Sequence, residues 1–369
     1  MNIIEKYFRG KTDKVSFIEL KDNVDAYQKY GIKEDVPLPI ILDEMVSGIS
    51  ENEFTNEIRI EYIIDGMLFM IAIDPEFTYT NDYKEILNRL IDNPSNYALS
   101  KGIRFLDIEL EWAILFTRAA FLLNEKNELA SFNYARILWN IDVPEDEKHV
   151  YVEESVRILE RILNYNDKNP LANFELGNIS VATGNYIKAN SYYNRALLNA
   201  DMEELKEEIR NAIVKISPDV AVENAIYSIN RMDYNTAITN LMDARKNSSR
   251  YDIPYYIAIS YMNIGQLELA EQFFEEAIEK GADFATLYTD YVYVKYLLKK
   301  DFEAVQIANE AIEKYPSEIK LRYNRAVILI SMNQNKKAIE DLDFILEYQD
   351  LSDEMFNQIM KIKESIYNK

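Results

Sequence analysis

Alanine residues recur along this chain in pairs whose two members are seven positions apart. From Ala237 onward, the first members of these pairs follow one another at intervals of 33 or 34 residues, and the series continues to Ala338. Small side chains are needed at such fixed positions when packed helices approach closely, because larger ones would hold the backbones apart. The pairs are Ala113/Ala120, Ala189/Ala196, Ala237/Ala244, Ala270/Ala277 and Ala304/Ala311. The pattern predicts a series of helical hairpins, each about 34 residues long.

The clearest repeat lies between residues 170 and 200. Gly177, in its first expected helix, leaves room for the second helix to pack against it. Gly184 and Asn185 are expected to form the turn, since glycine and asparagine tolerate a positive φ. Tyr186 is then expected to fold over the turn onto the core. A second strong copy of this order lies at 251–281.

These residues, in this order, resemble the consensus of the tetratricopeptide repeat family, and the resemblance covers residues 95–350. It implies an all-α fold: a right-handed superhelical solenoid of helical hairpins with an N-terminal helical module and a C-terminal capping helix. It also implies a non-enzymatic scaffold that binds a protein or peptide on its concave face. In this family the first helix of each hairpin lines that face. The resemblance leaves the target open.

We expect three parts along the chain: a mainly helical module at 1–94, about seven repeats at 95–350, and a capping helix at 351–369. An extra helix is expected at about 202–216, where apolar residues have helical spacing between two repeats. The turn within 285–316 reads as one residue short. The expected repeats are 95–127, 128–169, 170–203, 217–250, 251–284, 285–316 and 317–350.

Residues 1–94 do not follow the repeat. A short strand is expected within Lys14–Leu20 and a helix at about Pro39–Ser50. Apolar residues between Ile58 and Met70 indicate a buried helix, and Asn81–Ile91 gives a third. We expect this module to cover the first repeat, since a terminal repeat would otherwise expose its core.

The expected concave face holds the candidate binding site. In the repeat family, the residues on either side of the small eighth position point to this face. Aromatic rings can hold the side chains of a peptide, while an asparagine amide can both donate to and accept from its backbone. The candidate protein- or peptide-binding residues are Phe174, Asn178, Asn230, Tyr255, Tyr256, Met262, Asn263, Tyr323 and Asn324. The alternative is that some of them only pack against neighbouring helices.

Related proteins that hold the carboxylate end of a peptide use a cluster of lysine, arginine and asparagine on this face. Here Asn178 is available, but basic residues are sparse before Lys320, Arg322 and Arg325. This departure argues against the carboxylate-binding subtype. The acidic chain favours a basic partner instead.

Composition restricts the chemistry further. The net charge is −22 and the pI about 4.6, so neither nucleic acid nor an anionic membrane is expected as a partner. Without cysteine, and with His149 as the one histidine, we expect no metal site, cofactor or catalytic residue. His149 is expected to be exposed in a loop, Asp142–Val150, whose acidic residues lack the spacing of a calcium loop. Acidic runs such as Glu275–Glu276 are expected to be solvated helix faces.

The first ten residues do not resemble a signal peptide, and the apolar stretches are too short to span a membrane, so a cytoplasmic location is expected. One alternative function is a bacterial cytosolic peptide-receptor regulator, a class that also joins a helical module to such repeats. An enzyme would need a site within 1–94. That segment has no basic recognition helix, which argues against direct DNA binding.

Overall fold

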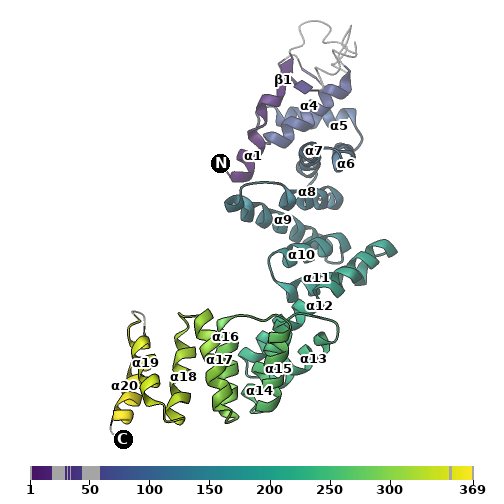
Figure 1. The fold of residues 1–369 in the computed structure, drawn as a ribbon. Coiled ribbons are helices and arrows are strands. Elements are labelled where there is room, and N and C mark those ends of the chain that lie inside the picture. Colours follow the sequence, from purple (N-terminus) through teal and green to yellow (C-terminus); the bar gives the residue numbers. More distant parts are fainter. Residues whose placement is uncertain are drawn as a thin grey trace. The chain divides into compact units, whose positions relative to one another are not determined.

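The computed structural model describes residues 2–18, 30, 32–33, 35–43, 59–348 and 351–367. The chain divides into two compact units, Met1–Ile213 and Val214–Lys369. In each unit, helices that are consecutive in the sequence pack against one another (Figure 1). The all-α, hairpin-based fold class predicted from the alanine pattern is confirmed, with one small sheet added near the N-terminus.

That sheet has two strands. After α1 (Ile3–Arg9), strand β1 (Val15–Ile18) pairs antiparallel with β2 (Leu38–Ile41). The strand expected within Lys14–Leu20 is therefore confirmed.

The helix expected at Pro39–Ser50 is wrong at its start, where the chain forms β2. Pro39 cannot donate a backbone hydrogen bond, and the β-branched Ile40 and Ile41 favour a strand. All four strand residues are buried. The part of the expected helix from residue 44 onward lies outside the described residues.

Two further helices, α4 (Ile60–Ile73) and α5 (Thr80–Leu90), confirm the buried helix and the helix expected at Asn81–Ile91. Every residue of α4 from Ile63 to Ile73 is buried, because α4 packs against both β2 and α7. The helices that follow in unit 1 are α6 (Pro94–Phe105), α7 (Leu110–Leu123), α8 (Glu128–Asn140), α9 (Glu145–Tyr165), α10 (Pro170–Ala182), α11 (Tyr186–Asn199) and the start of α12 (Glu203–Asn230).

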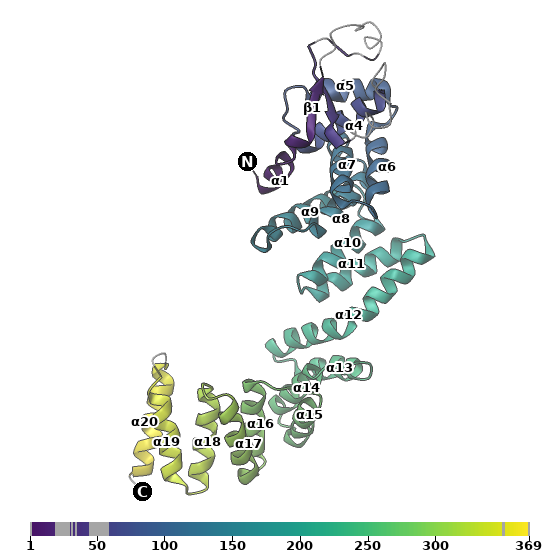
Figure 2. The same cartoon turned by 45° about the horizontal axis from the view of Figure 1, so that its top comes forward.

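One continuous hydrophobic core runs through unit 1. Its buried side chains extend from Ile4 in α1 to Ile179 in α10. Figure 2 shows β1, α4 and α5 beside α6 and α7. The elements before residue 94 therefore share their core with the hairpins that follow.

Helix α9 corrects the loop expected at Asp142–Val150, which is helical from Glu145 onward. Glu145, Asp146 and Glu147 occupy the first turn of this helix. Carboxylates are favourable there because they face the positive end of the helix dipole. His149 is exposed, as expected, but it lies on the helix.

Helix α12 joins two segments that the sequence presents as separate. The expected extra helix at 202–216 and the first helix of the repeat expected at 217–250 form one continuous helix. Pro218 lies inside it and cannot donate a hydrogen bond to the carbonyl group of Val214. The hydroxyl group of Ser217 donates to that carbonyl at 2.9 Å, which helps the helix to continue past the proline.

Unit 2 continues with a regular series of helices. They are α13 (Tyr234–Arg245), α14 (Asp252–Asn263), α15 (Leu267–Glu279), α16 (Ala285–Leu297), α17 (Asp301–Lys314), α18 (Ile319–Ser331), α19 (Asn335–Leu346) and α20 (Asp353–Tyr367). The last of these buries Ile359 against α19, so it covers the final hairpin.

From α10 onward, the turns within the hairpins share a residue with a positive φ angle. Gly184 and Gly265 have φ angles of 73° and 79°. Met232, Lys299 and Asn333 adopt φ angles of 61°, 62° and 60° at the equivalent turns. Because Lys299 follows Gly265 at the usual 34-residue interval, the shortened turn expected after α16 is wrong.

Gly177 confirms the close helix approach predicted for its hairpin. A Cβ atom on this residue would lie 2.3 Å from ring atom Cε1 of Tyr193 on α11. Ala189 and Ala196 on the same helix are fully buried. The ring of Tyr193 therefore occupies the space that a larger residue at position 177 would need.

In the run Glu275–Glu276, Glu275 is exposed as expected, whereas Glu276 is only partly exposed. Arg245 of α13 donates hydrogen bonds of 2.8 and 3.0 Å to Glu276, and Tyr291 of α16 donates to Glu275 at 2.8 Å. Each contact joins α15 to a helix outside its own hairpin. These carboxylates therefore connect successive hairpins.

Replacing a fully buried alanine tests this packing. Ala270→Leu should lower the free energy of unfolding by about 1–3 kcal/mol, because the added carbons overpack the interface. Glu279→Ala, on the exposed face of the same helix, should change it by less than about 0.5 kcal/mol. Urea denaturation followed by circular dichroism compares the two. Equal losses would contradict the placement of Ala270 between packed helices.

The turn at Met232 offers a stabilising change. A left-handed conformation costs a residue with a Cβ atom about 1–2 kcal/mol, and this side chain is 78% exposed. Met232→Gly should raise the free energy of unfolding by up to about 1 kcal/mol, since the larger chain entropy of glycine offsets part of the gain. Met232→Ala keeps the Cβ atom and should give no increase. The urea midpoints of the two variants measure the effect. Equal shifts would show that the left-handed conformation of Met232 does not destabilise the fold.

Candidate functional site

The first helices of successive hairpins border a cavity of about 370 Å³ in unit 1. Its lining is Phe132, Arg136, Trp139 and Asn140 from α8, Leu171, Phe174, Glu175 and Asn178 from α10, and Leu205 and Glu208 from α12. Two of the expected site residues, Phe174 and Asn178, thus lie in the same cavity.

Glu175 is the buried charged group of this cavity, with 4% of its surface exposed. Nε1 of Trp139 donates a hydrogen bond to its Oε1 atom at 2.7 Å, and Nδ2 of Asn178 donates to its Oε2 atom at 3.3 Å. Burial raises the pKa of Glu175, and these two hydrogen bonds and the charge of Arg136 offset the effect only in part. Each carboxylate oxygen accepts one hydrogen bond from these donors and keeps a further lone pair.

A chain of hydrogen bonds fixes the orientation of Asn178. The hydroxyl group of Tyr193, on α11, donates to its Oδ1 atom at 2.8 Å, while its Nδ2 atom donates to Glu175. The ring of Tyr193 also packs against Phe174, with 5.5 Å between the ring centroids. Asn178 therefore positions the carboxylate group of Glu175.

Two other charged residues of the lining, Arg136 and Glu208, are exposed. Within the described parts of the chain, neither side chain makes a hydrogen bond or an ion pair. Both still act on Glu175: the positive charge of Arg136 lowers its pKa and the negative charge of Glu208 raises it. With two carboxylates and one guanidinium, the lining carries an excess of negative charge when all three are ionised.

Five polar residues of this cavity were not among the expected site residues: Arg136, Trp139, Asn140, Glu175 and Glu208. The sequence does contain an indication for Glu175, because it is a charged residue between Phe174 and the Leu-Gly pair of the clearest repeat. Trp139 is one of two tryptophans in the chain, but its repeat matches the pattern too weakly to give it a position.

In unit 2, the expected aromatic residues lie beside a second carboxylate. The hydroxyl group of Tyr255, on α14, donates to Oδ2 of Asp290, on α16, at 3.3 Å. Burial raises the pKa of Asp290 to about 6. The ring of Tyr255 packs against those of Tyr256 and Phe284, with centroid distances of 5.2 and 5.0 Å. Asp290 was not among the expected residues.

The other expected residues pack or are exposed. Asn324 donates a hydrogen bond of 3.1 Å to the backbone of α16, and Tyr323 and Met262 pack against hydrophobic clusters. Asn230 and Asn263 are exposed. These residues do not line the cavity that holds Phe174 and Asn178.

The basic residues near the C-terminus are engaged in contacts within unit 2. Arg325 donates hydrogen bonds of 2.5 and 2.8 Å to Asp341. The guanidinium group of Arg322 lies 3.8 Å from the ring centroid of Phe344. Their internal partners agree with the argument against a carboxylate-binding subtype.

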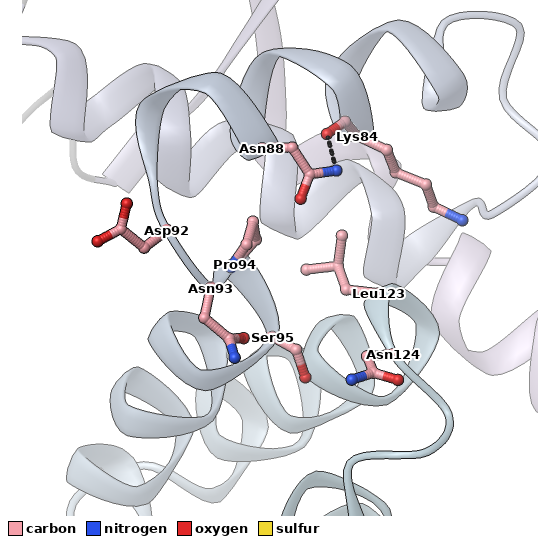
Figure 3. Close-up of a pocket in the computed structure, with 8 residues that line it drawn as sticks. All are labelled: Lys84, Asn88, Asp92, Asn93, Pro94, Ser95, Leu123 and Asn124. Atoms are coloured by element: carbon pink, nitrogen blue, oxygen red, sulfur yellow. Dashed lines mark hydrogen bonds between the residues drawn. The ribbon is translucent and has the colours of Figure 1, made fainter.

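Another cavity in unit 1, of about 300 Å³, lies where α5 and α7 end and α6 begins (Figure 3). The amide group of Asn88 donates to the backbone carbonyl of Lys84 at 2.8 Å, as Figure 3 shows. The hydroxyl group of Ser95 donates to the carbonyl of Ala120 at 2.8 Å. These polar groups satisfy backbone atoms near helix ends, so their presence has a structural explanation.

Two kinds of site are absent from the described parts of the chain. There, no group of three acidic or histidine side chains is placed to hold a metal ion. Likewise, none of the helices described has the length and apolar character that crossing a bilayer requires.

Residues 255–279, in the hairpin of α14 and α15, match the family model described as "Tetratricopeptide repeat". The chain thus contains a tetratricopeptide repeat. The matched segment begins at Tyr255 and includes three more of the expected site residues, Tyr256, Met262 and Asn263. No curated protein matches the sequence.

Several solved structures resemble this chain. The TPR2AB domain of yeast Sti1, in a complex with pHSP90, is 17% identical over 66% of this chain and 98% of its own, with a TM-score of 0.28. A tetratricopeptide repeat protein of Parabacteroides merdae is 15% identical over 72% of this chain and 97% of its own, with a TM-score of 0.33. Yeast Tom70 is 14% identical over 83% of this chain and 59% of its own, with a TM-score of 0.37. At these values the likeness does not extend to binding residues or partners.

The buried carboxylate predicts a pH effect on stability. Because burial raises the pKa of Glu175 in the folded protein, the folded state holds this proton more tightly than the unfolded state does. The group therefore destabilises the fold as the pH rises from its unfolded pKa of about 4.3 through the raised value.

Glu175→Gln removes this ionisation with little change of shape. The variant should unfold at a higher temperature than the natural protein at pH 7, and the difference should shrink towards pH 4. Thermal unfolding over this pH range measures it, with Glu208→Gln as the exposed control. A less stable variant at pH 7 would mean that the ionised form is favourable in the fold.

Proposed function

We propose that this protein is a non-enzymatic scaffold that binds a protein or peptide along the first helices of its hairpins, anchored in the cavity between α8, α10 and α12. The observation that carries the proposal is the lining of that cavity, where Phe132, Trp139 and Phe174 accompany a positioned carboxylate. Ligand-binding cavities are commonly about 300–1,000 Å³ in volume and combine apolar walls with a few placed polar groups. Three successive first helices contribute, so an extended chain lying across them could contact all three.

The chemistry of the lining supports binding over catalysis. Of the side chains that act as nucleophiles in enzymes, the lining holds the carboxylates of Glu175 and Glu208 and no hydroxyl, thiol, imidazole or amino group. The one histidine of the chain, His149, lies outside the lining. A binding role accounts for the cavity without a chemical step.

The residues around Asp290 support a second contact region for the same function. Tyr255 and Tyr256 are only partly buried and stand beside its carboxylate group. Aromatic side chains that combine apolar area with a hydroxyl group are frequent anchors in interfaces. We assign them a contact region for a protein or peptide on unit 2.

A matched pair of leucine changes tests the anchor site. A randomised peptide library is panned against the full chain, and the dissociation constants of the selected peptides are measured by calorimetry. Leu171→Glu, in the lining, should weaken binding at least tenfold, about 1.4 kcal/mol, by placing a charge against the apolar wall. Leu198→Glu, on the 83% exposed leucine of α11, makes the same chemical change outside the lining and should have little effect.

Equal affinities for both variants would reject the cavity as the anchor. A library that yields no saturable binder would reject the proposed function itself. Circular dichroism on both variants checks that the helices remain folded.

A further inference from the structure

The acceptor geometry of Glu175 indicates which chemical group the cavity receives. Trp139 and Asn178 each donate to a different oxygen of its carboxylate group. Each of the two oxygens therefore keeps one acceptor position for a ligand. A planar guanidinium group presents two parallel donors that match two carboxylate oxygens. An ammonium group is a point charge and lacks this match.

The walls of the cavity suit the same group. Phe132, Trp139 and Phe174 all contribute to the lining. Guanidinium groups stack on aromatic faces and are more weakly hydrated than ammonium groups, so they enter such a site at a lower desolvation cost. The cavity volume of about 370 Å³ leaves room for one long side chain.

We propose that this cavity binds an arginine side chain of an extended peptide or protein segment, with its guanidinium group paired to both oxygens of Glu175. This inference rests on the proposed function and names the residue that the anchor site selects. The exposed carboxylate of Glu208 adds a second attraction from α12.

Arg136 opposes a bound cation, but the balance favours attraction. Its side chain is exposed, so water and salt screen its repulsion. Glu175 is buried, and a charge interacts more strongly where the surroundings are less polar. Besides these two, Glu208 is the other ionised side chain of the lining, and Tyr193 approaches from α11 through Asn178. The exposed charges of Arg136 and Glu208 are both screened, so the buried charge of Glu175 decides the balance.

Small probes test the inference directly. N-acetylarginine methylamide, its lysine counterpart and its neutral citrulline counterpart are titrated into the full chain while tryptophan fluorescence is recorded. Arginine should bind at least ten times more tightly than citrulline and several times more tightly than lysine. Trp139→Phe should abolish the signal, because the other tryptophan, Trp112, is only 8% exposed in the core of unit 1.

Two variants with the same charge change locate the effect. Glu175→Gln should remove the preference for arginine over citrulline, and Glu279→Gln, on the exposed face of α15, should leave it intact. Arginine binding should also weaken on acidification, because protonation of Glu175 removes the paired charge, and this pH dependence should be absent in Glu175→Gln.

Three results would overturn the inference: equal binding of arginine and citrulline, an unchanged preference in Glu175→Gln, or loss of the preference in Glu279→Gln. If library peptides without arginine still bind in a manner sensitive to Leu171→Glu, the scaffold function stands while the arginine site fails. If no peptide or probe binds saturably, both proposals fail.

Discussion

The ring of Tyr193 over Gly177 is the contact on which both the hairpin of α10 and α11 and the cavity depend. The ring occupies the place of a missing Cβ atom, which lets the two helices approach. The same ring packs against Phe174, and its hydroxyl group orients Asn178, which in turn holds Glu175. A residue that the repeat requires for packing thus also fixes the geometry of the candidate site. The fold and the site cannot vary independently here.

In both units, an aromatic donor on one first helix bonds a carboxylate on the next first helix. Trp139 reaches Glu175 at 2.7 Å and Tyr255 reaches Asp290 at 3.3 Å. Burial still raises the pKa of both acids, so desolvation outweighs the hydrogen bonds in each case. A well-packed apolar pair would join these helices without that cost. Stability alone therefore does not account for these two acids, which agrees with a role in binding a ligand.

The sequence was sufficient for the hairpins, because small residues and turn glycines act locally. Predictions from the sequence were wrong where the conformational preference of a residue was overridden by its neighbours. The two helices expected on either side of residue 217 are one helix, because Ser217 compensates for Pro218, and the helix expected at Pro39–Ser50 begins as strand β2. For the site, Phe174 followed from the repeat register, whereas Trp139 did not. Its position depends on how α8 packs beside α10, which no short-range spacing encodes.

The overall charge of −22 and the buried carboxylate act on a cationic partner at different ranges. Surface charges attract any cation, but at physiological salt their influence is screened beyond about 8 Å. Such attraction speeds encounter and selects poorly among basic groups. Glu175 acts only after a side chain has left water, where the geometry of its two oxygens counts as much as its charge. The acidic surface would therefore draw a basic partner in, while the cavity alone would determine which residue of that partner is held.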